Sequence, residues 1–188
     1  MKRAVTAVLP VLLLAGCLGS APKAPVNWTI EPKAASVFSA AAAKWGTVRL
    51  ASVSVRAPYD GQRLAVLRAD GSIAFDAFNT FAAAPAALMR GAARDVVEGS
   101  GLFARVVQAT SSAAAPHALE IGVTRLALDC RTEGERRAVC ELTVLLLNGR
   151  EVVGAARGSG DMPAGTGNYS EAFSSAFTAA LSEALGRL

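Results

Sequence analysis

The sequence predicts an α+β fold: a mostly antiparallel sheet built from two strand groups, each followed by an amphipathic helix, in a single domain. Three observations predict it. Short segments with alternating apolar residues recur between residues 47 and 156, hairpin-type turn residues separate several of them, and two longer segments carry apolar residues at helical spacing. Strands in runs, followed by a helix, are typical of α+β proteins. The chain has 188 residues, 52% hydrophobic and 18% charged, so it is not a disordered protein.

Residues 1–16 form a secretory signal peptide in this interpretation. Lys2 and Arg3 precede an apolar run that is too short to span a bilayer, and the run ends in Leu14-Ala15-Gly16-Cys17. These four residues match the bacterial lipobox, in which the Cys thiol receives a diacylglyceryl group and becomes the new N-terminus. We therefore expect Cys17 to carry a covalent lipid. Leu18 is not the Asp that retains lipoproteins in the inner membrane, which favours the outer membrane, with the domain on its periplasmic face.

The charge balance changes once the signal peptide is set aside. Removing Lys2 and Arg3 from the 19 basic residues leaves 17 against 15 acidic ones, a net charge of +2. A nucleic-acid-binding protein needs a basic stripe, so this class is not expected. No later segment has the length and apolarity of a membrane-spanning helix. Residues 17–26 then form a small, Pro-containing tether behind the lipidated Cys, and residues 27–188 form the folded domain.

The first strand group covers residues 28–75. Trp28 begins a short strand, and Thr47 to Val55 form a longer one whose alternation slips at Ala51-Ser52, which predicts a bulge. Asp70-Gly71 predicts a hairpin between the strand at 64–67 and the strand at 73–75. Pro85 then begins a helix that Gly99-Ser100-Gly101 ends.

The second strand group begins at Phe103. Alternation from Leu119 to Cys130 changes parity near Thr124-Arg125, which predicts a second bulge. The strand from Cys140 to Leu146 pairs with it, and Asn148-Gly149 predicts a hairpin to the strand at 151–156. We expect a Gly-rich loop from Gly158 to Gly167 before the last helix.

Two Cys residues remain after Cys17. Cys130 and Cys140 lie on the apolar side of adjacent antiparallel strands, and the periplasm is oxidising. If the two residues face each other, a disulfide Cys130–Cys140 is within reach and closes a short loop, worth about 2–3 kcal/mol. A redox or metal pair is the alternative, although two Cys and the single His117 supply few ligands and the spacing is not Cys-x-x-Cys.

No catalytic or cofactor motif emerges from the sequence. His117 follows Pro116 on an expected surface loop, and no Gly-x-Ser-x-Gly element accompanies it, although a triad assembled in space stays open. Gly165-Thr166-Gly167 resembles half of a dinucleotide fingerprint, but no second strand follows. We expect a non-enzymatic protein with no metal, and no cofactor besides the lipid on Cys17.

The last helix is the other candidate site. Its apolar stripe is either core or a docking or lipid-facing surface, and it consists of Phe173, Phe177, Leu181, Leu185 and Leu188. Its opposite side is small and weakly charged, which indicates that the helix is covered on more than one side. The cover is the protein's own sheet, a second copy, a partner or lipid.

Several of these segments together resemble the ABC-type transport auxiliary lipoprotein family, whose best-known members belong to the paraquat-inducible intermembrane transport systems. The resemblance covers about residues 27–188. It lies in the lipobox, the strand Val48–Val55 with Ala57-Pro58-Tyr59, the segment Phe75-Asp76-Ala77-Phe78-Asn79, the Pro-started helix, Gly99-Ser100-Gly101-Leu102-Phe103 and the Ala-rich last helix. The chain departs from the family in having only Trp28 as an aromatic residue in its first strand and in carrying the two Cys.

The resemblance implies an outer-membrane lipoprotein that is an accessory or docking subunit of a lipid transport system. Its partners would be a protein with mammalian-cell-entry (MCE) domains and the subunits of an inner-membrane ABC or related transporter. Phospholipid is a further ligand it suggests, and the family leaves a homo-oligomer open. Two alternatives share the anchor and tether: an assembly or pilot lipoprotein of an envelope complex, and a periplasmic lipid carrier with a dry cavity between helices and sheet.

Overall fold

The computed structural model describes residues 24–31, 40–165 and 167–188. Cys17 and the signal peptide lie outside the described residues. The elements in chain order are β1 (Val26–Trp28), β2 (Trp45–Val55), β3 (Arg63–Arg68), β4 (Ile73–Phe81), α1 (Pro85–Gly99), β5 (Phe103–Gln108), β6 (His117–Cys130), β7 (Arg137–Asn148), β8 (Glu151–Pro163) and α2 (Tyr169–Gly186). None of the helices in these ranges is long and apolar enough to cross a bilayer.

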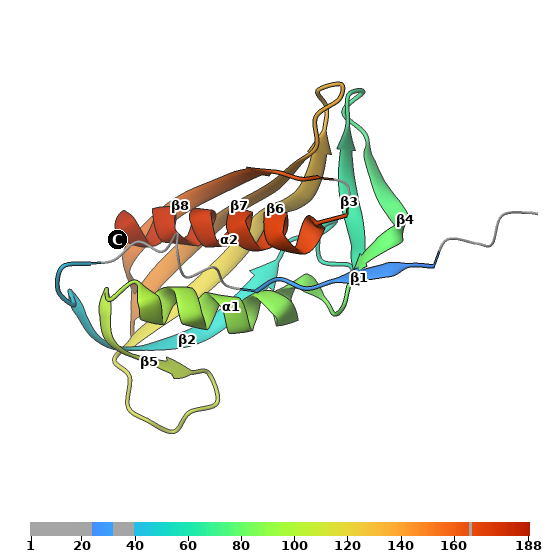
Figure 1. Ribbon diagram of the computed structural model, residues 1–188. Helices are drawn as coiled ribbons and strands as arrows, with labels where there is room; N and C mark the ends of the chain where they lie inside the picture. Colours follow the sequence, from blue (N-terminus) through green and yellow to red (C-terminus); the bar gives the residue numbers. More distant parts are fainter. Residues whose placement is uncertain (1–23, 32–39, 166) are drawn as a thin grey trace, which may run out of the picture.

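The eight strands form one mixed sheet, with both helices on the same face (Figure 1). The long strand β6 organises it. On one side β6 pairs with β7, which pairs with the edge strand β8. On the other side β6 pairs with β2 along its first half and with β3 near its end, and β5, β4 and β1 complete the sheet.

The predicted α+β class with a mostly antiparallel sheet is wrong; the fold is α/β with a mixed, largely parallel sheet. The pairings β1·β4, β2·β5, β2·β6 and β3·β6 are parallel, whereas β3·β4, β6·β7 and β7·β8 are antiparallel. The antiparallel pairs are hairpins, which local turn residues encode. The parallel pairs join strands that are not neighbours in sequence, and no local turn signal reports them.

Local predictions fared better. The register shifts between Leu50 and Ser52 and between Val123 and Arg125 confirm both bulges. The hairpins at Gly71 and Gly149 are present, and both glycines have positive φ, 81° and 61°. The expected loop from Gly158 is wrong, because β8 continues to Pro163.

The core fills the layer between the sheet and the two helices. Phe173 of α2 meets Phe81 of β4 edge-on, with ring centroids 5.4 Å apart, and Trp28 meets Tyr169 at the same separation. Residues 29–31 are tied to the start of α2, since Ser170 Oγ donates to the Thr29 carbonyl at 2.8 Å and Glu31 N–H to Ser174 Oγ at 2.9 Å. The first described residues are therefore fastened to both layers.

Candidate docking surfaces

The apolar stripe of α2 is core in the monomer. Phe173, Phe177, Leu181 and Leu185 are each 0% exposed. Burying each such side chain stabilises the fold by roughly 1.5–3 kcal/mol. These four side chains therefore have no surface left to offer a partner or a lipid while the fold stays closed.

Two glycines of β8 let α2 approach the sheet at backbone distance. A Cβ added to Gly158 would lie 1.8 Å from the Ala180 carbonyl oxygen, and one added to Gly160 would lie 1.9 Å from that of Ala176. Real Cβ atoms do not approach so closely, so the helix seats on the sheet only where β8 has no side chain. This contact explains the Gly-rich sequence that resembled a loop.

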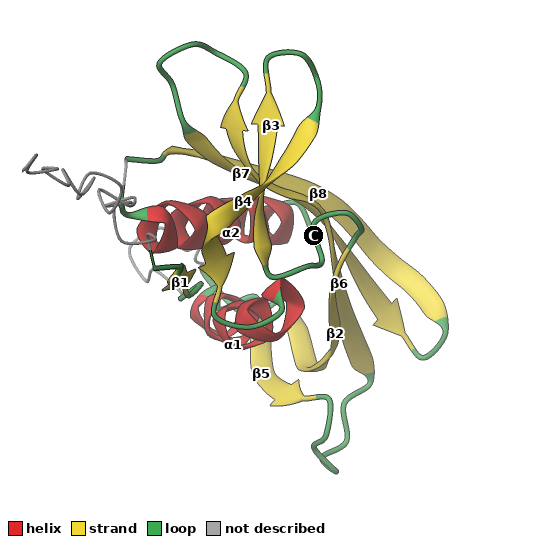
Figure 2. Cartoon of the chain, turned by 90° about the vertical axis from the view of Figure 1, so that its right-hand side faces the viewer, coloured by secondary structure: helices red, strands yellow, loops and turns green. Residues whose placement is uncertain are grey.

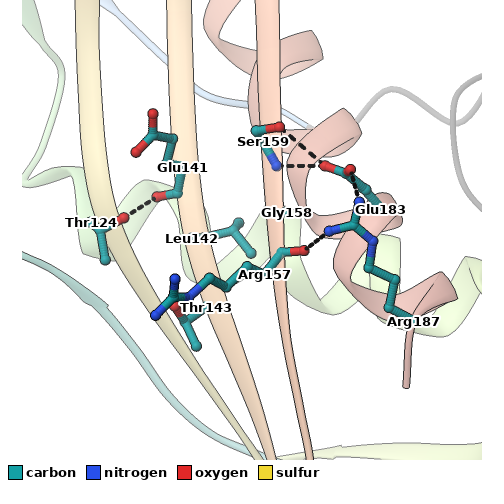
Figure 3. Close-up of a pocket in the computed structure, with 9 residues that line it drawn as sticks. All are labelled: Thr124, Glu141, Leu142, Thr143, Arg157, Gly158, Ser159, Glu183 and Arg187. Atoms are coloured by element: carbon teal, nitrogen blue, oxygen red, sulfur yellow. Dashed lines mark hydrogen bonds and ion pairs between the residues drawn. The ribbon is translucent and has the colours of Figure 1, made fainter.

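The last turns of α2 cover part of the free edge of β8 (Figure 3). Glu183 accepts a hydrogen bond from Ser159 N–H at 2.7 Å, and Arg187 Nη1 donates to the Arg157 carbonyl at 2.9 Å. Both are backbone groups on the side of β8 that faces away from β7. Side chains at the end of α2 thus form hydrogen bonds with backbone groups of β8 that an edge strand would otherwise offer to another strand.

A groove of about 290 Å³, lined mainly by polar and charged residues, lies at this edge. The Ser159 backbone N–H, followed by the charge of Arg187, holds the pKa of Glu183 below its ordinary value. Glu183 is therefore ionised at neutral pH and already bound, which makes it a poor proton donor or acceptor. The groove is lined by Thr124, Glu141, Leu142, Thr143, Arg157, Gly158, Ser159, Glu183 and Arg187.

The predicted disulfide Cys130–Cys140 is wrong: both thiols are free. Cys140 stands opposite Leu126, four residues before Cys130 on β6, so the two Cα atoms are separated by about 13 Å at 3.3 Å per residue. A disulfide needs less than about 7 Å. The turn around Gly134, with φ 77°, sets this register, and burial raises the pKa of both thiols. At this separation the two thiols can neither form a redox pair with each other nor bind one metal ion together.

His117 is not on a loop as expected but begins β6. Its ring meets Trp45 edge-on at 5.1 Å between centroids, and its buried Nδ1 has no hydrogen-bond partner within the described part of the chain. In the same residues, no three His, Cys, Asp or Glu side chains are grouped as metal ligands. His117 has the surroundings of a packed ring and not those of a general base oriented by a carboxylate.

Arg49 secures the crossover between β5 and β6, a feature the sequence analysis missed. Val48 and Leu50 are buried under the helices, so Arg49 between them points to the opposite face. Its guanidinium donates to four carbonyl groups of the crossover, at 3.2 Å to Gln108, 3.3 Å to Ala109, 2.5 Å to Ser111 and 2.7 Å to Ala113. No periodicity of the chain signals such a contact.

The other end of the sheet exposes apolar residues. Ile73, Phe75 and Phe78 of β4 are 38%, 39% and 44% exposed. β4 forms a hairpin with β3, and its other neighbour is the short strand β1 (Figure 2). Phe75 and Phe78 belong to the segment that carried the family resemblance, but no sequence pattern indicated that they would be exposed.

No protein-family model and no curated protein matches the chain. Among solved structures, it is similar to a Xanthomonas campestris protein described as a member of the DUF330 family, with a TM-score of 0.61 and 21% identity over 86% of this chain and 88% of that one. The two proteins share a fold. A second match, an uncharacterised protein, has a TM-score of 0.51 and 15% identity over 82% and 92% of the two chains. The dodecameric PelC of Paraburkholderia phytofirmans is a looser match, with a TM-score of 0.44 and 15% identity over 81% and 94%.

Proposed function

We propose that this protein is a lipid-anchored accessory subunit of an intermembrane lipid transport system, located on the periplasmic face of the outer membrane. The observation that carries the proposal is the lipobox Leu14-Ala15-Gly16-Cys17 ahead of a tether and a folded domain. Two or more acyl chains hold a protein at a membrane effectively permanently. The family resemblance supplies the partners: an MCE-domain protein and inner-membrane transporter subunits.

The described structure supports a role in binding and positioning. His117 packs against Trp45 without a carboxylate partner, Glu183 is held by Ser159, and the thiol of Cys140 is buried. Acid–base and nucleophilic chemistry is built from groups of these kinds, and none of these three is placed for it. The similarity to the DUF330 protein concerns the fold alone and adds neither a role nor a partner.

The packing of the core does not favour the lipid-carrier alternative. Large side chains fill the layer between helices and sheet, where a carrier would hold acyl chains; Phe173, Phe177, Met89 and Leu181 are all fully buried there. We therefore propose that the protein binds the subunits that conduct lipid and does not enclose lipid in its own core.

A crosslinked purification from membranes tests the proposal. The tagged full chain is crosslinked in cells, isolated from solubilised membranes, and its partners are identified by mass spectrometry, with Cys17→Ser as the unanchored control. The proposal predicts an MCE-domain protein and transporter subunits with the wild-type chain and their loss with Cys17→Ser. Recovery of an outer-membrane assembly complex alone would support the pilot alternative and overturn the proposal.

A further inference from the structure

Three apolar side chains on and beside one face of β4 remain exposed at the end of the sheet. Ile73 and Phe75 stand opposite Leu67 and Ala65 of β3, and cross-strand partners share a face. Leu67 and Ala65 belong to a small cluster separate from the main core, so Ile73 and Phe75 lie on the face turned away from the helices. Exposed apolar residues scattered singly are ordinary, whereas large ones gathered on one strand point to an interaction surface.

Phe78 lies in a bulge of β4 whose backbone is held by hydrogen bonds. The pairing of β4 with β3 passes from Phe75 opposite Ala65 to Thr80 opposite Arg63, so residues 76–79 form a bulge. Asp76 organises the bulge: its carboxylate accepts hydrogen bonds from Phe78 N–H at 2.7 Å, Asn79 N–H at 3.0 Å and Asn79 Nδ2 at 2.8 Å. Such Asx turns hold a local backbone shape. These hydrogen bonds therefore fix the backbone of the segment that carries Phe78.

The chain enters the fold beside this bulge. β1 runs parallel to β4, and its first residue, Val26, stands opposite Asn79 (Figure 1). Trp28 Nε1 donates to Asn79 Oδ1 at 3.0 Å, which fastens the entry point to the bulge. Cys17 lies nine residues before Val26, a reach of at most about 32 Å at 3.6 Å per residue. An anchor on Cys17 thus keeps the bulge near the bilayer, whatever path the tether takes.

One cation beside the exposed rings suits a phospholipid surface. The Arg63 guanidinium lies 5.2 Å from the centre of the Phe75 ring. The other charges nearby are balanced, since Arg68 interacts with Asp70 and the Asp76 carboxylate is taken up by hydrogen bonds within the bulge. Aromatic side chains flanked by Arg are typical of protein segments that lie at the headgroup level of anionic membranes. The other exposed apolar pair, Val152 and Val153, lies on β8, the opposite edge of the sheet, where the tether gives no reason to expect lipid.

We propose that Ile73, Phe75 and Phe78 dock on the phospholipid surface of the membrane that anchors Cys17, and so fix the orientation of the tethered domain. This inference rests on the lipid anchor of the proposed function. A fixed orientation would turn the groove at the α2–β8 edge and the Val152–Val153 edge away from the membrane, towards the periplasm.

Site-specific photocrosslinking tests the docking. A benzophenone amino acid replaces Phe75 in one variant of the full lipidated chain and Val152, which is also exposed, in the matched control. Both are reconstituted in vesicles of phosphatidylethanolamine with a minority of phosphatidylglycerol, irradiated and analysed by mass spectrometry. The proposal predicts lipid adducts at residue 75 and only background at residue 152.

Other results overturn it in distinguishable ways. Equal lipid adducts at both positions, or adducts at residue 75 with protein alone, refute the docking while leaving the anchor intact. A chain that carries no lipid on Cys17 refutes the anchor and the docking together. Hydrogen exchange on the unsubstituted chain provides a second readout: amides at 73–79 should exchange more slowly on vesicles than in the soluble Cys17→Ser chain, whereas amides at 152–155 should not change.

Discussion

The close seat of α2 on β8 predicts a large loss of stability from a single methyl group. In Gly160→Ala, the new Cβ would lie 1.9 Å from the Ala176 carbonyl oxygen, whereas ordinary contact begins at 3.4 Å, so α2 must move by roughly 1.5 Å. The obstacle is helix backbone, which cannot rotate away as a side chain can. Moving α2 also loosens Phe173 and Phe177 from the core. Overpacking typically costs about 1–3 kcal/mol, and we expect about 3 kcal/mol here.

Thermal unfolding followed by circular dichroism measures the effect. For a domain of this size, about 3 kcal/mol corresponds to a decrease in Tm of roughly 6–12 °C. Gly46→Ala is the matched control, because Gly46 is also in a strand and a Cβ there would meet nothing within 4 Å. Gly46→Ala should leave Tm unchanged or raise it slightly, since it restricts the unfolded chain. A Gly160→Ala protein as stable as Gly46→Ala would refute the backbone contact.

Three further predictions concern other contacts. Arg49→Met removes the donor to the crossover carbonyls and should lower the free energy of unfolding by about 1–2 kcal/mol, with faster hydrogen exchange at 109–116; unchanged exchange there would contradict the contact. Cys130 and Cys140 should both react with iodoacetamide in the denatured chain without reductant, whereas a Cys130–Cys140 crosslinked peptide would contradict the register. The folded pKa of Glu183 is depressed, so its stabilising contribution is present above its ordinary pKa of about 4.5 and disappears as the pH falls through the lower folded value. The Tm difference between wild type and Glu183→Gln should therefore be constant near neutral pH and shrink below about pH 4.5; a difference that grows on acidification would contradict the Ser159 contact.

The features that were predicted correctly are the ones that local sequence determines. The slips in alternation at Ala51-Ser52 and Thr124-Arg125 are bulges, and Asp70-Gly71 and Asn148-Gly149 are hairpins, because bulges and turns depend on a few adjacent residues. The direction of the sheet depends on which distant strands meet. The β2·β5 and β2·β6 pairings join strands that α1 and the crossover held by Arg49 separate along the chain, and no neighbouring residues encode them.

The predictions about candidate sites also failed where they depended on contacts between residues distant in sequence. The disulfide was wrong because register was inferred from Cys130 and Cys140 alone, whereas the Gly134 turn shifts the pairing by four residues. The Gly158 segment resembled a loop because glycine is rare in strands unless backbone approaches closely, and that approach comes from α2, distant in sequence. The lipid anchor stays a prediction, since Cys17 lies outside the described residues.

The anchor is the claim on which both the proposed function and the docked orientation rest. The most direct measurement is the mass of the N-terminal peptide of the mature chain, together with the membrane fraction in which the chain is found. We predict an N-terminal peptide that begins at Cys17 and carries a diacylglyceryl group. We also predict that the whole chain is found in the outer-membrane fraction. An unmodified Cys17, or a chain recovered in the soluble periplasmic fraction, would contradict the account.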